Sequence, residues 1–172
     1  MADDTDALRR VIDRDALEDL ARTYMRGLDR RDAGLLRSVF HDDATTHYGA
    51  FAGTPDEFVA YAMQALSSHE ANQHLIGQVN LWFDGLDAAQ GEVYFSAFHR
   101  LSRHDVRTDM TISGRYVDRY ERRAGAWGMT HRTEIVDWAR TEPTQDDYMP
   151  ARPALVVGRP DLDDLSYRID KA

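Results

Sequence analysis

The sequence predicts an α+β fold in which N-terminal helices pack on one face of a curved antiparallel sheet. Apolar residues recur with helical spacing in the first part of the chain, and from residue 74 they alternate with the period of two that is typical of strands. The predicted strands follow one another as a meander after the helices. A curved sheet that helices close from one side encloses a pocket, so we expect a cone-shaped molecule.

Three segments have the apolar spacing of helices: residues 15–30, 32–40 and 53–66. In the first, Glu18 stands three residues after Asp15, which is the spacing of a capping box. In the third, Thr54 is a suitable N-cap, Pro55 fits the first helical position and Glu57 completes a capping box. Both helix starts are therefore predicted from local side-chain chemistry.

The remaining periodic segments are strands: a β-like stretch over 41–51, then residues 74–83, 89–101, 110–122 and 127–138. An Asp-Gly pair at 84–85 predicts a hairpin after the first long strand. The sequence RRAGAW predicts a tight turn before the last one. We assign residues 1–140 to a single domain.

Residues 141–172 hold four of the five prolines and lose the strand pattern. We expect an extended arm that packs on the domain or on a neighbouring subunit. A disordered tail is the alternative, although Tyr148, Leu155 and Tyr167 make this segment more apolar than a free tail needs.

Composition narrows the possible partners. The formal net charge of −9 disfavours binding to nucleic acid, because phosphate backbones repel an acidic surface. The absence of cysteine excludes disulfides, thiolate nucleophiles and cysteine-bound zinc. No apolar run is long enough to span a bilayer, and the acidic start resembles no targeting peptide. We expect a cytoplasmic protein without a membrane partner.

Three stretches carry a resemblance to a known family. They are LEDLARTYMRGLDRRD at 17–32, FHDDAT at 40–45 and GRYVDRYERRAGAWGMTHR at 114–132. Together they resemble the SnoaL-like branch of the nuclear-transport-factor-2-like (NTF2-like) superfamily, over roughly residues 8–140. The resemblance implies the cone-shaped α+β fold. The members most similar in these motifs are hexachlorocyclohexane dehydrochlorinases, bile-acid 7α-dehydratases and scytalone dehydratases.

The resemblance also implies roles for individual residues. The strand histidine that acts as general base in these enzymes matches His74, and the aspartate that orients it in the dehydrochlorinases and the bile-acid dehydratases matches Asp29. Arg132 matches the closing arginine of the last motif, and Tyr24 matches a tyrosine that lies five residues before the aspartate. One dehydratase also uses an acidic residue on the following strand, where this chain has no clear counterpart.

Each of these residues has an ordinary structural alternative. His74 and Asp29 can form a base and its orienting carboxylate, or can be separate solvated side chains. Arg132 can hold an anionic group of a substrate, or can form a structural ion pair. Tyr24 can donate to a developing oxyanion, or can be a core residue with a satisfied hydroxyl.

Aromatic and histidine side chains on the strands are candidates for the pocket wall: Tyr48, Trp82, Phe98, His99 and Tyr116. His99 shares a strand face with apolar residues, so it is either a core histidine or a second acid or base. His69, Glu70 and His74 match no standard metal-ligand spacing. We expect neither a metal nor a cofactor.

We therefore expect a cofactor-independent lyase that eliminates water, halide or a carbon fragment from a hydrophobic, ring-containing small molecule. Two alternatives stay open. An isomerase would use the same dyad and return the proton elsewhere. A non-catalytic binding or oligomer-forming module would have a plugged cone and a wide separation between Asp29 and His74. The family resemblance further implies a homodimer or a homotrimer.

Overall fold

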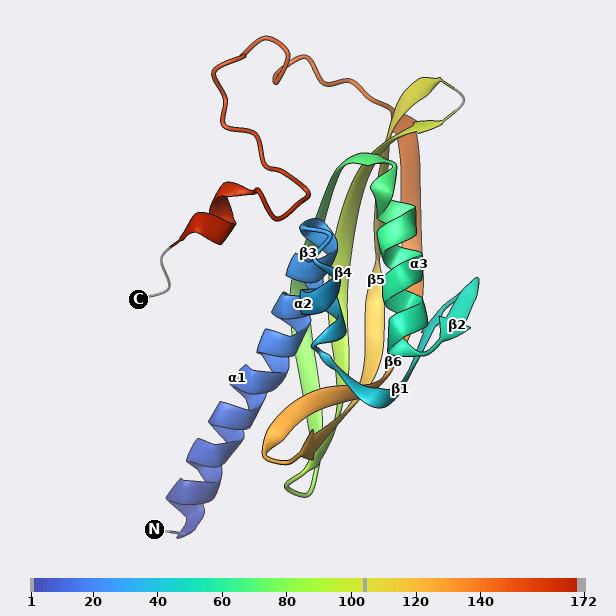
Figure 1. Ribbon diagram of the computed structural model, residues 1–172. Coiled ribbons are helices and arrows are strands. Elements are labelled where there is room, and N and C mark those ends of the chain that lie inside the picture. Colours follow the sequence, from blue (N-terminus) through green and yellow to red (C-terminus); the bar gives the residue numbers. More distant parts are fainter. Residues whose placement is uncertain (1, 104, 170–172) are drawn as a thin grey trace.

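The computed structural model describes residues 2–103 and 105–169, which form three α-helices, six strands and a short 3₁₀ helix (Figure 1). In chain order these are α1 (Ala2–Asp29), α2 (Ala33–Arg37), β1 (Phe40–Tyr48), β2 (Phe51–Gly53), α3 (Pro55–Ser67), β3 (His69–Asp84), β4 (Ala88–Arg103), β5 (Val106–Arg123), β6 (Ala126–Pro143) and η1 (Leu165–Arg168). The predicted α+β class is confirmed.

The strands form one sheet in the order β2-β1-β6-β5-β4-β3. The strands from β3 to β6 are an antiparallel meander, as predicted. β1, however, pairs with β6 in parallel, so the sheet is mixed rather than wholly antiparallel. The whole meander separates these two strands in the chain, so no hairpin dictates their relative direction.

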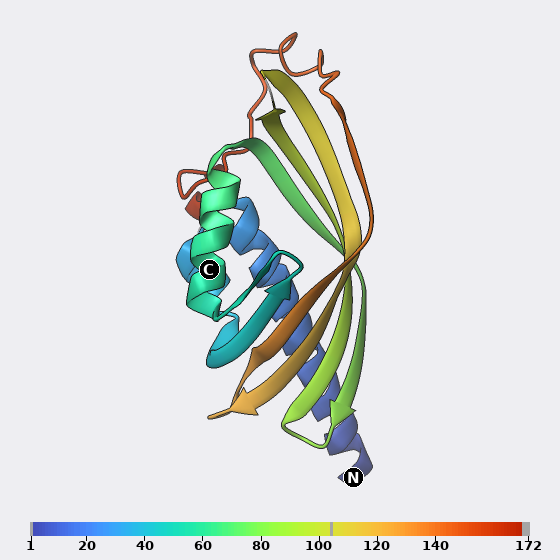
Figure 2. The same ribbon diagram turned by 90° about the vertical axis from the view of Figure 1, so that its right-hand side faces the viewer.

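The sheet is strongly curved and twisted, and the three helices lie on its concave face (Figure 2). The core fills the space between them. Leu17 and Leu36 from the helical side and Val93 and Met129 from the sheet are fully shielded from solvent. The sheet stays open, with β2 and β3 as its edges.

The predicted capping chemistry is observed at the start of α3 but not at the start of α1. Thr54 and Glu57 form the reciprocal capping box at the start of α3. By contrast, α1 begins at Ala2 rather than near Asp15. The extra turns are attached through buried Asp13, which accepts two hydrogen bonds from Arg122 and one from the Trp127 indole.

After β6 the chain crosses to the helical side, where η1 lies beside α1 (Figure 1). The Tyr167 hydroxyl donates to Asp32 at 2.8 Å, and the Arg26 guanidinium lies over the Tyr167 ring. Buried Asp164 accepts hydrogen bonds from the backbone of Arg159 and Ser166. The last part of the expected arm, residues 170–172, lies outside the described residues.

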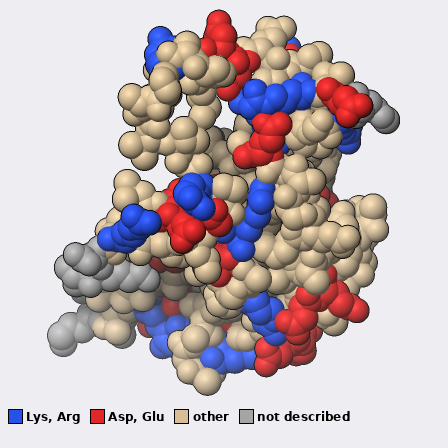
Figure 3. Space-filling model, turned by 45° about the horizontal axis from the view of Figure 1, so that its top comes forward, with Lys and Arg blue, Asp and Glu red and all other residues tan. Residues whose placement is uncertain are grey.

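Positive and negative side chains are intermingled on the face shown in Figure 3. Many are paired; Arg115, for example, binds both Glu92 and Asp137. None of the helices in residues 2–103 and 105–169 is long and apolar enough to cross a membrane.

Candidate active site

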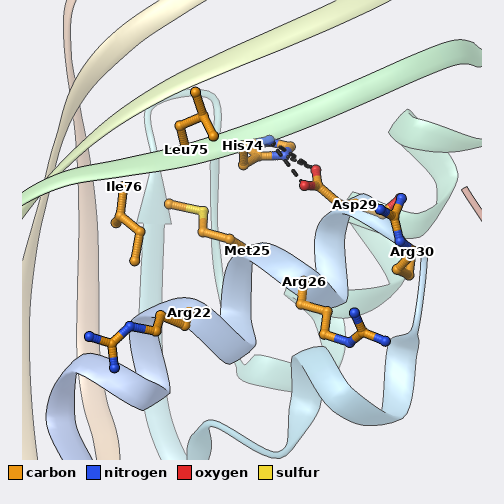
Figure 4. A pocket seen from close by; sticks show the side chains of 8 residues that line it. All are labelled: Arg22, Met25, Arg26, Asp29, Arg30, His74, Leu75 and Ile76. Atoms are coloured by element: carbon orange, nitrogen blue, oxygen red, sulfur yellow. Dashed lines mark hydrogen bonds and ion pairs between the residues drawn. The ribbon is translucent and has the colours of Figure 1, made fainter. Parts of the chain in front are cut away.

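The last residue of α1 and the first half of β3 bring Asp29 and His74 into contact (Figure 4). The distance from Asp29 Oδ1 to His74 Nδ1 is 2.7 Å. The side chain of His74 is 6% exposed and that of Asp29 is 16% exposed. Asp29 and His74, which are 45 positions apart in the sequence, are therefore neighbours in a largely buried setting.

The Asp29 carboxylate is held by β3 through more than the imidazole. The His74 backbone N–H donates to Oδ1 and Oδ2 at 3.0 and 3.2 Å, and the Asn72 amide donates to Oδ1 at 3.2 Å. Because a carboxylate only accepts hydrogen bonds, Nδ1 of the His74 ring must be the donor in their contact. The ring is then left with Nε2 as its free acceptor.

His74 also forms part of the wall of a cavity of about 450 Å³ between the helices and the concave face of the sheet. Apolar and aromatic side chains make up most of the wall, including Leu28, Phe58, Ala62, Leu66, Met110 and Ile112. The polar side chains of the wall are Tyr24, Tyr48, Tyr61, His69, His74, His99, Arg103, Tyr116 and Glu134. An apolar cavity with a few convergent polar groups is typical of a small-molecule site.

Tyr24 and Tyr48 form a pair of phenols at the cavity. Their hydroxyl oxygens are 2.8 Å apart, and the Tyr48 ring stacks on Phe58 with centroids separated by 4.2 Å. Burial raises the pKa of Tyr24 to about 12, against the opposing effect of the nearby Arg132 charge. Burial also raises the pKa of Tyr48 and Tyr116 well above the ordinary value. The phenols therefore stay protonated at neutral pH and can donate to an oxyanion.

Arg132 is a structural residue beneath the cavity wall, and it does not line the cavity. Its Nε and Nη2 donate to the two oxygens of Asp118 at 2.8 and 2.7 Å, and both side chains are fully buried. The guanidinium lies between the rings of Tyr24 and Tyr116, 4.2 Å from each centroid. Of its two predicted roles, the geometry matches the ion pair, and contact with a substrate anion is not supported.

Three imidazoles cluster on the wall. The ring centroids of His99 are 4.9 Å from His69 and 5.1 Å from His74. Burial, together with the neighbouring histidines, lowers the pKa of His99 to about 3, so this ring is neutral at physiological pH. Within the described residues, no group of three His, Asp or Glu side chains is arranged to hold a metal ion.

His69 reaches the cavity because of a bulge in β3. The odd spacing from His69 to His74 would put the two rings on opposite faces of a regular strand. The register shifts between His69 and Ala71, so one extra residue turns both rings inward. Strict alternation therefore gives no sign of His69 as a wall residue.

Two predicted wall residues, Trp82 and Phe98, do not line the cavity. The register of β3 shifts again between Ile76 and Val79, which inverts the alternation that starts at His74. Trp82 is therefore on the outer face and 58% exposed. Phe98 lies one residue from His99 on regular β4, so it also faces outward, beneath the Arg100 guanidinium. Tyr48, His99 and Tyr116 do line the cavity.

Glu134 is a wall residue that the sequence analysis missed. It lies two positions after Arg132 on β6 and opposite Tyr116 in register. Burial raises the pKa of its carboxyl group, against the effects of His74 and Arg132. Alternation along β6 was the available signal, because residues two apart share a strand face.

Solved structures share this architecture. A type 2 hexachlorocyclohexane dehydrochlorinase (LinA) has 22% identity and a TM-score of 0.74, over 87% of this chain and 99% of the other. LinA-type3 from Novosphingobium barchaimii has 22% identity and a TM-score of 0.70, over 81% and 94%. A candidate scytalone dehydratase from Novosphingobium aromaticivorans has 19% identity and a TM-score of 0.71, over 84% and 94%. These likenesses show the NTF2-like fold.

Sequence comparison identifies the family independently of the fold. A search of curated proteins found no significant match. The family model described as a SnoaL-like domain, however, matches residues 9–133, which include most of α1, the cavity wall of β3 to β5 and the Arg132–Asp118 pair. The chain therefore belongs to the SnoaL-like domain family.

Proposed function

We propose that this protein is a lyase that eliminates a small leaving group from a hydrophobic, ring-containing molecule, with His74 as the general base. The observation that carries the proposal is the 2.7 Å contact between Asp29 and His74 beside an apolar cavity of about 450 Å³. The names of the structural neighbours, dehydrochlorinases and a candidate dehydratase, describe eliminations and support the same reaction class.

In the proposed reaction, Nε2 of His74 takes a proton from a carbon next to a carbonyl group. The electron pair of the broken C–H bond delocalises into the carbonyl and then forms the new C=C bond as the leaving group departs. Asp29 holds the ring in the correct tautomer and stabilises the imidazolium that forms. General acid–base catalysis of this kind contributes about 10²–10⁴-fold, which suits an already activated C–H bond.

In this proposal, Tyr24 and Tyr48 stabilise the enolate oxygen. One of the two hydroxyls donates to the other, so the second proton of the pair is free for a ligand. Arg132 lies behind the Tyr24 ring and acts through it, because its charge favours negative charge on and near the phenol. Arg132 is therefore a positioning residue in this proposal.

The cavity and the dyad favour an enzyme over a non-catalytic module, for which we expected a plugged cone and separated residues. An isomerase would use the same first step and differ only in where the proton returns. Product analysis separates the two, since a lyase releases the leaving group and an isomerase keeps it.

The test uses 3-hydroxy-1-tetralone, a bicyclic β-hydroxy ketone that yields fluorescent 1-naphthol and water on dehydration. We expect the wild-type protein to catalyse the release of 1-naphthol. The substitution His74→Gln should lower kcat/KM by about 10²–10⁴-fold, because Gln cannot accept the proton. Turnover by His74→Gln at the wild-type rate would contradict the proposed base.

His47→Gln is the matched control. His47 is exposed on β1 and is absent from the cavity wall, so the same chemical change should leave kcat/KM unchanged. Circular dichroism and the midpoint of urea unfolding should be alike in both variants, which shows that loss of turnover reflects chemistry rather than folding.

A further inference from the structure

Glu134 stands apart from the other buried or partly buried acidic side chains of the sheet. Asp118 is paired with Arg132, Asp109 with Arg100, and Glu92 with Arg115. The Glu134 carboxyl group forms no hydrogen bond or ion pair with any residue in the part of the chain that the structure describes, although it is partly buried on the cavity wall. A carboxyl group that lines a cavity and has no protein partner is available to a ligand.

Burial favours the neutral form of the Glu134 carboxyl group and raises its pKa, while the charges of His74 and Arg132 oppose this effect. Arg132, on the same strand, is committed to Asp118 by two hydrogen bonds. The titratable and charged groups that face the same cavity come from six other elements: Tyr24 (α1), Tyr48 (β1), Tyr61 (α3), His69 and His74 (β3), His99 and Arg103 (β4) and Tyr116 (β5). Most of these groups are neutral, and a substrate that displaces water from the cavity would disfavour the carboxylate further.

An elimination of water needs a proton donor as well as a base, because hydroxide is a poor leaving group. His99, the residue that the sequence offered as a second acid or base, holds no proton to give as an imidazolium at neutral pH. Tyr24 and Tyr48 are assigned to the enolate oxygen. Among the wall residues that the structure describes, Glu134 is the only carboxylic acid, which is a far stronger acid than the phenols of Tyr61 and Tyr116.

We propose that Glu134 enters the reaction protonated and gives its proton to the leaving oxygen of a β-hydroxy ketone. This inference rests on the proposed function. His74 takes the proton from carbon, the C–O bond breaks with its electron pair on oxygen, and the Glu134 proton joins that oxygen to release water. Glu134 ends as the carboxylate and His74 as the imidazolium, so transfer of one proton from His74 to Glu134 restores both groups.

The leaving oxygen of a β-hydroxy ketone lies close to its carbonyl oxygen in the same molecule. Glu134 and the phenols line one continuous cavity, and Glu134 lies near enough to affect the titration of Tyr24 and Tyr116. Adjacent donors for the two oxygens are therefore available, with the base on another strand. This arrangement suits substrates whose leaving group departs only when it gains a proton.

The experiment compares two substrates that share the skeleton, the acidic C–H bond and the product 1-naphthol. One is 3-hydroxy-1-tetralone, and the other is 3-acetoxy-1-tetralone, whose acetate departs without a proton. We expect Glu134→Gln to lower kcat/KM for the hydroxy substrate by about 10²-fold or more, and to leave the acetoxy substrate within about threefold of wild type. Glu142→Gln, an exposed change on the same strand, should affect neither substrate.

The pH profile provides a second readout. For the wild type, kcat/KM with the hydroxy substrate should fall at high pH as Glu134 loses its proton, and the acetoxy substrate should lack this fall. A slowing of both substrates by the same factor in Glu134→Gln would overturn the role as acid while leaving His74 as base. Loss of both reactions in His74→Gln supports the proposed function, and failure of the wild type on both substrates overturns it together with this inference.

A spectroscopic measurement keeps the inference testable if Glu134→Gln folds poorly. With 1-naphthol bound at neutral pH, the infrared spectrum of the wild type should contain a protonated carboxyl band. A band that shifts on ¹³C-glutamate labelling supports a neutral glutamic acid in the cavity. Its absence overturns the proposal.

Discussion

Two aspartates, the partly buried Asp29 and the fully buried Asp118, each hold a basic side chain at 2.7 Å, and the two pairs lie on the same concave side of the sheet. Asp118 and Arg132 are fully buried, and Arg132 is enclosed by aromatic rings. Asp29 holds His74, whose ring faces a cavity. Contact distance therefore does not distinguish a structural pair from a candidate catalytic one; the difference is whether the basic group has a free nitrogen that a ligand can reach.

The same substitution, aspartate to asparagine, tests this difference between the two pairs most directly. Asp118→Asn leaves the Arg132 charge buried without its partner, so we expect the free energy of unfolding to fall by about 3–5 kcal/mol. Urea unfolding followed by tryptophan fluorescence measures the loss. A change below about 1 kcal/mol would mean that water or another group compensates the guanidinium.

Asp29→Asn should have the opposite effect: stability should change little and turnover should fall. Asn can still accept from the backbone N–H of His74 and the amide of Asn72, so the unfolding midpoint should change little. Turnover of 3-hydroxy-1-tetralone should fall on the order of 10²-fold, because a neutral amide neither fixes the tautomer nor stabilises the imidazolium. Unchanged turnover together with lower stability would reduce the dyad to a structural contact.

The smallest expected effect concerns the pH dependence of stability. Burial raises the pKa of Glu134 above its ordinary value of 4.5, so at pH values between the two the folded protein binds more protons than the unfolded chain. The free energy of unfolding should therefore fall as pH rises through this window. Below the ordinary pKa of 4.5, Glu134 is protonated in both the folded and the unfolded state, so its destabilising effect disappears. Glu134→Gln should flatten this part of the curve relative to Glu142→Gln. An identical slope in both variants would contradict the shift.

Much of the fold follows from local rules in the sequence. The capping box at Thr54 predicts the start of α3, and alternation predicts the long strands to within a few residues. The parallel pairing of β1 with β6 was not predictable in this way, since it joins segments that no turn connects. The start of α1 at Ala2 likewise depends on a tertiary contact, the attachment of Asp13 to Arg122.

The candidate site was likewise predicted only in part from the sequence. Family resemblance paired Asp29 with His74, and the structure places them in contact. Strand alternation assigns Tyr116 and His99 to the cavity but fails for Trp82, because a bulge intervenes. Glu134 was missed although alternation from Arg132 pointed to it, since nothing in the sequence shows that its carboxyl group has no partner.

The second bulge of β3 has a consequence for how this chain can tolerate length changes. Upstream of it His74 and Ile76 face inward, whereas downstream Val79, Leu81 and Phe83 do, so the strand consists of two halves that are out of phase by one residue. Deleting either Gly77 or Gln78 would force the halves into a single phase. Either the imidazole would leave the cavity or three apolar side chains would turn to water. This short stretch thus links the position of the His74 ring in the site to the packing of the core, and insertions or deletions there should be poorly tolerated.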